Sequence, residues 1–227
     1  MCGRYVSPDQ AAIEREWHIG RHNWDGWVLP RFNVAPTSLV PIILSGEAGD
    51  DELLSARGDL IPSWWKKDKP PALTFNARSE EAAMKPTWRQ SVQSKRCLMP
   101  ARGWYESNER EQVESASGRK VNRPYYICSP SSEVIAFAGL WSVWERPDAP
   151  SMLTCALMSK AAAPSITAIH HRMPVVLAPA QYDAWLDPAT SANEVAALIA
   201  REEFDGHAVS TRVNKPSEDD AGLIESA

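Results

Sequence analysis

The stretch VIAFAGLWSVW, residues 134–144, is almost continuously apolar and carries the β-branched and aromatic residues typical of a buried strand. Similar runs predict further strands at 39–45, 96–101, 124–129, 151–159 and 172–178. Segments with helical spacing predict short helices at 9–19, 81–93, 163–170, 179–187 and 191–203. Because strands dominate, we expect an α+β protein with a largely antiparallel, curled sheet.

The rest of the chain favours one domain spanning residues 1–227. The 18 prolines divide it into short pieces, which favours strands and loops over long helices. The polar stretch 107–123 predicts a hairpin loop, and residues 216–227 predict an acidic tail. No run is long and apolar enough to span a bilayer, and no basic segment followed by an apolar one opens the chain. We therefore expect a cytoplasmic, monomeric protein with no membrane partner.

Charge and cysteine content exclude some classes of function. The net charge of −5 argues against general nucleic-acid binding, although the acidic residues cluster and leave room for a local basic face. Cys97, Cys128 and Cys155 lie in apolar runs typical of strands, so we expect reduced core residues. No cysteine or histidine spacing is typical of a zinc site, so no metal and no cofactor are predicted.

The opening MCGRY places Cys2 directly behind the start methionine. Methionine aminopeptidase trims Met1 when the next side chain is small, and removal would leave Cys2 with an α-amine and a thiol on adjacent carbons. Their ordinary pKa values, about 8 and about 8.5, leave a reactive fraction of each at neutral pH. On these five residues alone, a covalent role and an accidental position for Cys2 are equally supported.

Several other polar residues stand beside predicted strands and turns. Asn76 and Arg78 follow an apolar run, Glu106 lies just past two aromatic residues, and His170 ends a predicted helical turn. Taken singly, a turn residue, a partner for an arginine and a hydrogen-bonded core histidine are the simpler interpretations. The Trp64–Trp65 pair precedes lysines in a predicted loop and could stack on unpaired bases, or one ring could pack inside.

Together, these segments resemble a known family. MCGRY, RFNVAPT, LIPSWW, FNARSE, CLMPARGWYE, IHHRMPVVL and STRVNKP occur in this order and cover nearly the whole chain. This set resembles the SRAP family, named for SOS-response-associated peptidase. The resemblance implies a single SRAP-type domain, with the sheet curled into a pseudo-barrel and short helices at its periphery.

The resemblance also implies a function: shielding of abasic sites in single-stranded DNA. The α-amine of Cys2 would condense with the aldehyde of the ring-opened sugar, and the thiol would then close a thiazolidine ring. Such a ring removes the imine that would otherwise lead to β-elimination and strand breakage. Only an N-terminal cysteine offers both nucleophiles in this geometry. On this basis, the partner is single-stranded DNA containing abasic sites, and the protein would be nucleoid-associated when bound to damage.

Site residues follow from the matching motif positions. Beside Cys2, the resemblance implies that Asn76 orients the cysteine and the sugar, that Glu106 is an acid/base carboxylate, and that His170 assists ring opening. His171 aligns with a variable position. The DNA-binding residues implied in the same way are Arg4, Asn33, Trp64, Trp65, Arg78, Ser159 and Arg172.

The sequence departs from the family pattern at one place, and three alternative functions remain open. Gly58 and Asp59 stand where the family usually has Trp-Gly before Leu-Ile-Pro, which puts local packing or DNA contact in doubt. Class II glutamine amidotransferases also begin with a reactive cysteine, although no glutamine-binding motif is found here. An autopeptidase that removes its own leader residue and a non-covalent single-strand binding module are the other two alternatives.

Overall fold

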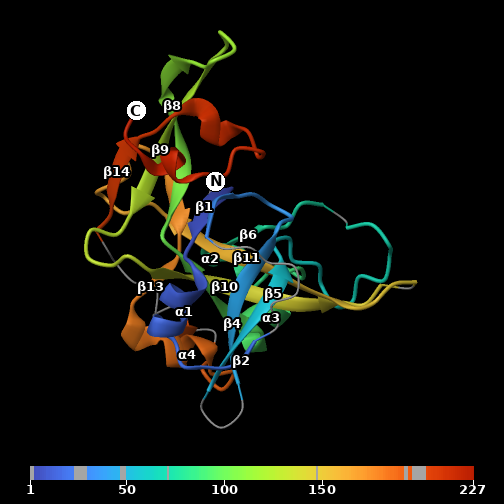
Figure 1. Cartoon of the computed structure of the whole chain (residues 1–227). Coiled ribbons are helices and arrows are strands. Elements are labelled where there is room, and N and C mark those ends of the chain that lie inside the picture. The colour runs from blue at the N-terminus through green and yellow to red at the C-terminus, as the bar shows by residue number, and fades with distance from the viewer. Residues whose placement is uncertain are drawn as a thin grey trace.

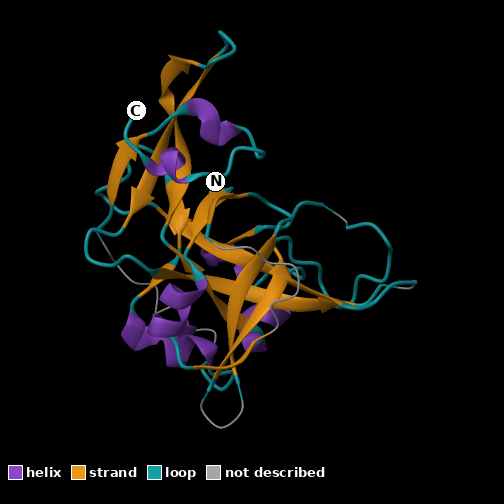
Figure 2. Cartoon of the chain, in the orientation of Figure 1, coloured by secondary structure: helices purple, strands orange, loops and turns teal. Residues whose placement is uncertain are grey.

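The computed structural model describes residues 3–22, 30–46, 50–70, 72–146, 148–191, 194–195 and 203–227. Strands dominate it, as Figure 2 shows, and they form two sheets. The larger sheet has the order β12-β11-β10-β7-β4-β5-β2, with β13 on β10 and β6 on β11. Its strands are β2 (Ile19–His22), β4 (Leu39–Ser45), β5 (Asp51–Arg57), β6 (Asn76–Arg78), β7 (Arg96–Ala101), β10 (Ile135–Trp144), β11 (Met152–Ala161), β12 (Arg172–Pro174) and β13 (Val176–Leu177).

Within the described residues, five of these strands close into a barrel. Neighbouring strands along β11-β10-β7-β4-β5 are antiparallel, and a parallel bridge between Thr154 and Arg57 joins β11 back to β5. Closure leaves few free strand edges. Apolar side chains from these strands, such as Phe137, Leu98 and Ile42, are fully buried. The sequence-based prediction of an α+β protein with a curled, mostly antiparallel sheet is confirmed.

The second sheet lies above the barrel in Figure 1 and has the order β14-β9-β8-β1-β3. Its strands are β1 (Arg4–Ser7), β3 (Arg31–Val34), β8 (Gly103–Glu114), β9 (Lys120–Cys128) and β14 (Asp205–Ala208). The N-terminal strand β1 is therefore internal, paired with β8 on one side and β3 on the other. Strand β1 thus lies inside the sheet rather than at a free edge.

Short helices cover the periphery. They are α1 (Gln10–Glu16), α2 (Ser79–Ala82), α3 (Arg89–Ser94) and α4 (Tyr182–Leu186), with the 3-10 turns η2 (Pro179–Gln181), η3 (Thr211–Asn214) and η4 (Ala221–Ile224). The side chain of Asp9 accepts a hydrogen bond from the Ala12 backbone N–H and caps α1. No helix in the described ranges is both long and apolar enough to cross a bilayer.

Two of the predicted helices are wrong. Residues 81–93 do not form one helix, because α2 ends before Pro86 and α3 starts after it. Residues 163–170 form turns instead of a helix. The β-branched residues Ile166, Thr167 and Ile169 in that segment are weak helix formers. The predicted helix at 191–203 falls mostly outside the described residues.

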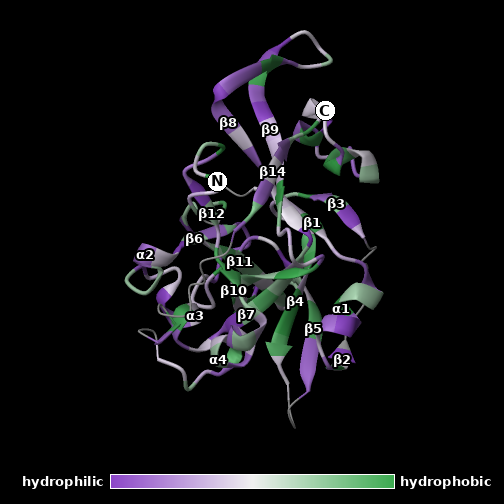
Figure 3. Ribbon diagram, turned by 90° about the vertical axis from the view of Figure 1, so that its left-hand side faces the viewer, coloured by the Kyte–Doolittle hydropathy of each residue, from purple (hydrophilic) through white to green (hydrophobic). Residues whose placement is uncertain are grey.

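The polar stretch 107–123 forms a hairpin, but the predicted loop is far too long. Strands β8 and β9 continue through Glu114 and from Lys120, and only residues 115–119 connect them. Gly118 in this turn has a φ of 73°, a conformation that glycine adopts without strain. Apart from the apolar pair Val113 and Val121, the outer half of the hairpin is mostly hydrophilic (Figure 3), and it extends beyond the rest of the protein.

The acidic C-terminal segment packs against β3. Asp219 accepts hydrogen bonds from the backbone N–H groups of Phe32 and Asn33 and pairs with Arg31. Leu223 in η4 is fully buried. Cys97 and Cys155 are buried in the core as predicted, whereas Cys128 is only half-buried. Burial raises the pKa of the Cys97 and Cys155 thiols.

Candidate active site

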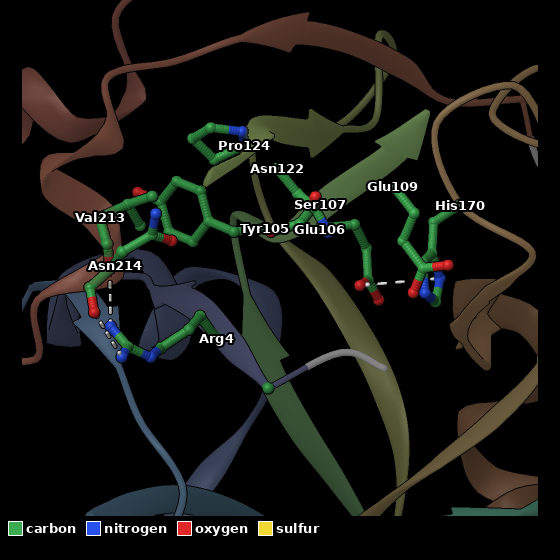
Figure 4. Close-up of a pocket in the computed structure, with 11 residues that line it drawn as sticks. Arg4, Tyr105, Glu106, Ser107, Glu109, Asn122, Pro124, His170, Val213 and Asn214 are labelled. Atoms are coloured by element: carbon green, nitrogen blue, oxygen red, sulfur yellow. Dashed lines mark hydrogen bonds and ion pairs between the residues drawn. The ribbon is translucent and has the colours of Figure 1, made fainter. Parts of the chain in front are cut away.

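A cavity of about 230 Å³ opens where β1 meets β8. Figure 4 shows the side chains around it, which come from β1, β8, β9, the segment before β12, and η3. The register of β1 on β8 pairs Arg4 with Tyr105, so Gly3 is level with Glu106 at the next step. The lining residues are Gly3, Arg4, Tyr105, Glu106, Ser107, Glu109, Asn122, Pro124, His170, Val213 and Asn214.

The chemically reactive side chains in this cavity are Glu106 and His170. Oε2 of Glu106 lies 3.6 Å from Nδ1 of His170, and both side chains are almost completely buried. Nδ1 of His170 is also 2.9 Å from the carbonyl oxygen of Arg172 and 3.1 Å from its backbone nitrogen. A carboxyl and an imidazole at this distance can pass protons to and from a bound molecule. The structure thus brings together the predicted acid/base pair.

The alternation of β8 explains why a carboxylate is buried here. Trp104 and Glu106 share one face of the strand, and Trp104 is fully buried against Phe137 and Phe204. Two positions further along the strand, the same face reaches the cavity. Gly103 at the start of β8 permits the close approach of β9, because a Cβ there would lie 2.4 Å from the carbonyl oxygen of Ile127.

Arg4 and Asn33, which the resemblance implies as DNA-binding residues, hold the C-terminal segment in this structure. Nη1 of Arg4 donates to Asn33 Oδ1 at 2.8 Å and to the Val213 carbonyl at 2.7 Å. Nδ2 of Asn33 donates to the carbonyls of Val213, Lys215 and Glu218. Asn33 is fully buried, so it offers no surface to DNA in this structure. Burial also lowers the pKa of the Arg4 guanidinium.

Arg78, Ser159 and Arg172 meet at one end of β11. Ser159 pairs with Arg78 on β6 at one edge of the strand and with Pro174 on β12 at the other. The Arg172 guanidinium donates to both carboxylate oxygens of Glu80 and to the Ser159 carbonyl and hydroxyl. Only 12% of the Arg172 side chain is exposed, whereas Arg78 is exposed. Of the two arginines, Arg78 is the one with surface available to a phosphate.

The Trp64–Trp65 pair lies outside the cavity, in the loop after β5. Trp64 is 53% exposed, and Trp65 donates from Nε1 to the Lys69 carbonyl at 2.8 Å. The rings meet edge to face with centroids 6.0 Å apart. Lys67 lies over the Trp65 ring, and Lys66 pairs with Glu145 at the end of the β10–β11 hairpin. One ring is thus available for stacking, and the other is held by its own loop.

The structure does not place two of the predicted site residues, Cys2 and Asn76, at the cavity. Cys2 lies outside the described residues, although its neighbour Gly3 lines the cavity. Asn76 is half-buried on β6, where it pairs with Leu157 of β11. In the described part of the chain, no group of three histidine, cysteine, aspartate or glutamate side chains has the arrangement of a metal site.

The Gly58–Asp59 departure is well accommodated. Asp59 is 1% exposed, and its Oδ1 accepts from the Thr74 backbone N–H at 2.6 Å and from the Thr74 hydroxyl at 3.0 Å. Oδ2 lies 3.4 Å from the Arg57 guanidinium. Asp59 therefore joins the two ends of the loop that carries the tryptophans. The weakened packing considered for this position is not found.

Sequence reasoning missed several polar residues of this region. Glu109 and Asn122 line the cavity from β8 and β9. Glu80 pairs with Arg172, and it was visible as the last residue of FNARSE, a motif in which only Asn76 and Arg78 received roles. The signal for Glu80 was present, but its partner lies 92 residues away in the chain.

Fold and site together define an α+β protein in which a closed mixed barrel carries a second sheet, and an internal N-terminal strand leads to a buried carboxyl–imidazole pair. The family model of SOS response associated peptidase (SRAP) matches residues 1–216. The chain belongs to the SRAP family.

Similar proteins cover the full length of the chain. The abasic site processing protein YoqW of Bacillus subtilis is 31% identical over 231 residues and covers 100% of both chains. The abasic site processing protein HMCES of Gallus gallus is 28% identical, covering 96% of this chain and 76% of the relative. A crystal structure of a protein from Bacteroides thetaiotaomicron, 23% identical, superposes with a TM-score of 0.82 over 100% of both chains, which supports the fold.

Proposed function

We propose that this protein processes abasic sites in single-stranded DNA by becoming covalently attached through Cys2 after removal of Met1. The free α-amine attacks the aldehyde of the ring-opened sugar and releases water to form an imine. The thiol then adds to the imine carbon, its proton passes to nitrogen, and a thiazolidine ring closes. The strand is protected, because the ring no longer carries the imine from which β-elimination proceeds.

The observation that carries this proposal is the cavity in which Gly3, the residue bonded to Cys2, lies with Glu106 and His170. Imine formation needs a proton donor for the departing hydroxyl, and opening of the sugar needs a proton on the ring oxygen. Glu106 and His170, 3.6 Å apart, are suited to supply and recover these protons. Names of full-length relatives that process abasic sites support the same substrate.

DNA binding is assigned to the exposed groups outside the cavity. Trp64 offers an open aromatic face beside Lys66 and Lys67, which is the combination that binds unpaired bases and their phosphates. Arg78 is the exposed arginine next to the β11 end of the site. Stacking on bases requires them to be unpaired, so single-stranded DNA is the expected substrate.

The test uses protein whose intact mass shows that Met1 is absent. A single-stranded oligonucleotide with one uracil is treated with uracil glycosylase, mixed with the protein, and separated on a denaturing gel. We expect an adduct that survives denaturation without a reductant. Cys2→Ala abolishes the stable adduct and leaves an imine that borohydride traps, whereas Cys128→Ala, at a half-buried cysteine away from the cavity, behaves like the unmodified chain.

A stable adduct in full yield from Cys2→Ala would refute the role of Cys2, and no adduct from the mature protein would refute the covalent function. In the second case, retention of affinity for single strands would point to a non-covalent binding module. Glutaminase activity would point to an N-terminal-cysteine amidohydrolase. Release of the leader residue by purified unprocessed protein, without an aminopeptidase, would demonstrate the autopeptidase.

A further inference from the structure

Strand β8 contains a bulge beside the cavity. Two successive pairs of the β8–β9 register lie on either side of it, Asn108 with Arg123 and Gln112 with Asn122. Residues 109–111 of β8 therefore have no partner on β9. Because side chains alternate between the two faces of a strand, a regular β8 would turn Glu109 to the face opposite Glu106. The bulge resets this alternation, and Glu109 lines the same cavity as Glu106.

A network of hydrogen bonds holds the bulge in place. The Glu111 carboxylate accepts from Nδ2 of Asn108 at 2.9 Å and from the Tyr125 hydroxyl at 2.9 Å. Oδ1 of Asn108, a side chain that is almost completely buried, accepts from the Arg110 backbone N–H at 3.0 Å. These contacts commit the Glu111 carboxylate to the bulge itself, whereas Glu109 is the bulge carboxylate that lines the cavity.

Glu109 lies at the open side of the cavity. Its side chain is exposed, whereas Glu106 and His170 are buried, and in Figure 4 it points toward that pair. Gly3, the residue bonded to Cys2, lines the same cavity. A sphere of the cavity's volume is about 8 Å across, which is close to the Debye length at physiological ionic strength. The charge of Glu109 is therefore only partly screened from a group that reacts in this space.

The proposed reaction passes through a cation in this space. The nitrogen of the Cys2 amine bonds to the aldehyde carbon, the resulting hydroxyl takes a proton and leaves as water, and the protonated imine that remains carries a positive charge. This charge disappears when the thiol sulfur bonds to the same carbon and the thiol proton is released. The free amine and aldehyde before these steps, and the thiazolidine after them, are uncharged. A negative charge nearby therefore stabilises the intermediate relative to both ends of the reaction.

We propose that Glu109 is a further functional residue of this site, a carboxylate that stabilises the protonated imine. The inference rests on the proposed function. Glu109 lies outside the motifs that carry the family resemblance, and the bulge brings it to the cavity. Glu106 and His170 move protons, while Glu109 contributes a negative charge from the solvent side. Arg4 adds the opposite charge to the cavity wall, so Glu109 also offsets a group that would disfavour the cation.

The experiment compares substitutions of Glu109 with the same substitutions of Glu114, which serves as the control on the outer part of β8. Both side chains are exposed and carry the same charge, but Glu114 is not among the residues that line the cavity. Glutamine removes the charge at each position, and arginine reverses it. The melting temperature of every variant is measured to check that it folds.

Crosslinking of protein that lacks Met1 is measured in single turnover at saturating abasic single-stranded DNA and at several salt concentrations. A pH of about 9 keeps most of the α-amine free in every variant, because its ordinary pKa is about 8. Reversal is measured as transfer of the protein to excess competitor abasic DNA.

For Glu109→Gln we expect formation and reversal of the adduct to slow by the same factor, about threefold, because both directions pass through the protonated imine. Glu109→Arg should slow both by about tenfold, since the change in charge is twice as large. These effects shrink as the salt concentration rises, because Glu109 is exposed. The final yield of adduct stays the same, and Glu114→Gln and Glu114→Arg match the unmodified protein.

Faster crosslinking by Glu109→Gln would overturn the inference, because Glu109 would then be repelling the DNA backbone instead of stabilising the imine. Rates equal to those of the Glu114 variants would overturn it as well. Slowing of formation alone, or slowing that does not change with salt, would indicate a displaced site and would also contradict the inference. If the unmodified protein forms no adduct at all, it is the proposed function that fails, and the inference fails with it.

Discussion

Replacement of Asn33 by alanine distinguishes a residue that holds the protein together from one that touches DNA. The amide lies between β3 and η3, with no exposed surface. It accepts from Arg4 at 2.8 Å and donates to the carbonyls of Val213, Lys215 and Glu218 at 3.2, 3.0 and 2.8 Å. Two hydrogens serve three acceptors, so the donated bonds amount to two full hydrogen bonds.

The expected loss follows from these contacts. Two neutral hydrogen bonds contribute about 1 kcal/mol each and the bond from the charged Arg4 about 2 kcal/mol, which gives about 4 kcal/mol at most. Water entering the vacated space reduces this to about 3 kcal/mol. For a chain of this size, each 1 kcal/mol lowers the melting temperature by about 2–4 °C, so Asn33→Ala should melt roughly 10 °C lower.

The assay is thermal and denaturant unfolding of Asn33→Ala beside Asn122→Ala. Asn122 lies on β9 and lines the cavity, so it controls for the loss of an asparagine side chain elsewhere in the protein. We expect destabilisation in the first variant alone, with crosslinking restored when Asn33→Ala is assayed well below its melting temperature. Asn33→Ala that melts with the unmodified protein but binds single-stranded DNA more weakly would refute the reasoning and return Asn33 to the DNA interface.

Three further predictions concern the site and its surroundings. Glu106→Gln should slow both formation and reversal of the adduct by about 10²–10⁴-fold, whereas His170→Ala should mainly slow formation. Reversal is measured as transfer of the protein to excess competitor abasic DNA. A Glu106→Gln protein that reacts and reverses at the normal rate would remove Glu106 from the mechanism. Trp64→Ala should weaken single-strand binding by roughly 1–3 kcal/mol without lowering the melting temperature, because the ring is 53% exposed; equal binding in fluorescence titration contradicts stacking. The Arg172 guanidinium lowers the pKa of Glu80. Ionised Glu80 therefore stabilises the fold above the ordinary pKa of a glutamate, and this stabilisation is lost as the pH falls through the lowered pKa. The difference in melting temperature between the unmodified protein and Glu80→Gln should shrink on acidification, and a constant difference from pH 6 to pH 3 would contradict this prediction.

The barrel strands β4, β7, β10 and β11 were predictable because each is a nearly continuous apolar run. The fifth barrel strand, β5, has the sequence DELLSAR and was not predicted, because its polar residues hide the pattern of a buried strand. The helices were less so, since Pro86 divides 81–93 and β-branched residues weaken 163–170. The hairpin at 107–123 was mistaken for a loop because composition alone suggested one. Its strands form through cross-strand pairs such as Val113 with Val121 and Glu114 with Lys120, and such pairing does not require an apolar sequence.

The motifs pointed to Glu106 and His170, which the structure brings within 3.6 Å of each other, but the contacts of the arginines could not be predicted from the sequence. An arginine beside polar motif residues is an equally good candidate for a phosphate contact or an internal ion pair until its partners are known. Arg4 donates to the Val213 carbonyl, which is 209 residues away in the chain, and Arg172 donates to Glu80, at a separation of 92 residues. These contacts join residues far apart in the chain, so only the folded structure shows them.

These contacts also bear on the electrostatic character of the cavity. Arg4 and Arg172 are occupied by internal acceptors, while Glu106 and Glu109 contribute carboxylates to the cavity wall. Arg4 keeps its positive charge at the cavity wall, because its acceptors are neutral, and an uncharged sugar in the cavity would meet the proton donors and acceptors of Glu106 and His170. In the proposed reaction, the sugar enters the cavity and its phosphates stay outside it, and Arg78 and the lysines beside Trp64 are exposed cations available to them. An acidic protein can in this way bind a polyanion, because selectivity for a neutral, reactive sugar and attraction for the charged backbone reside in different places.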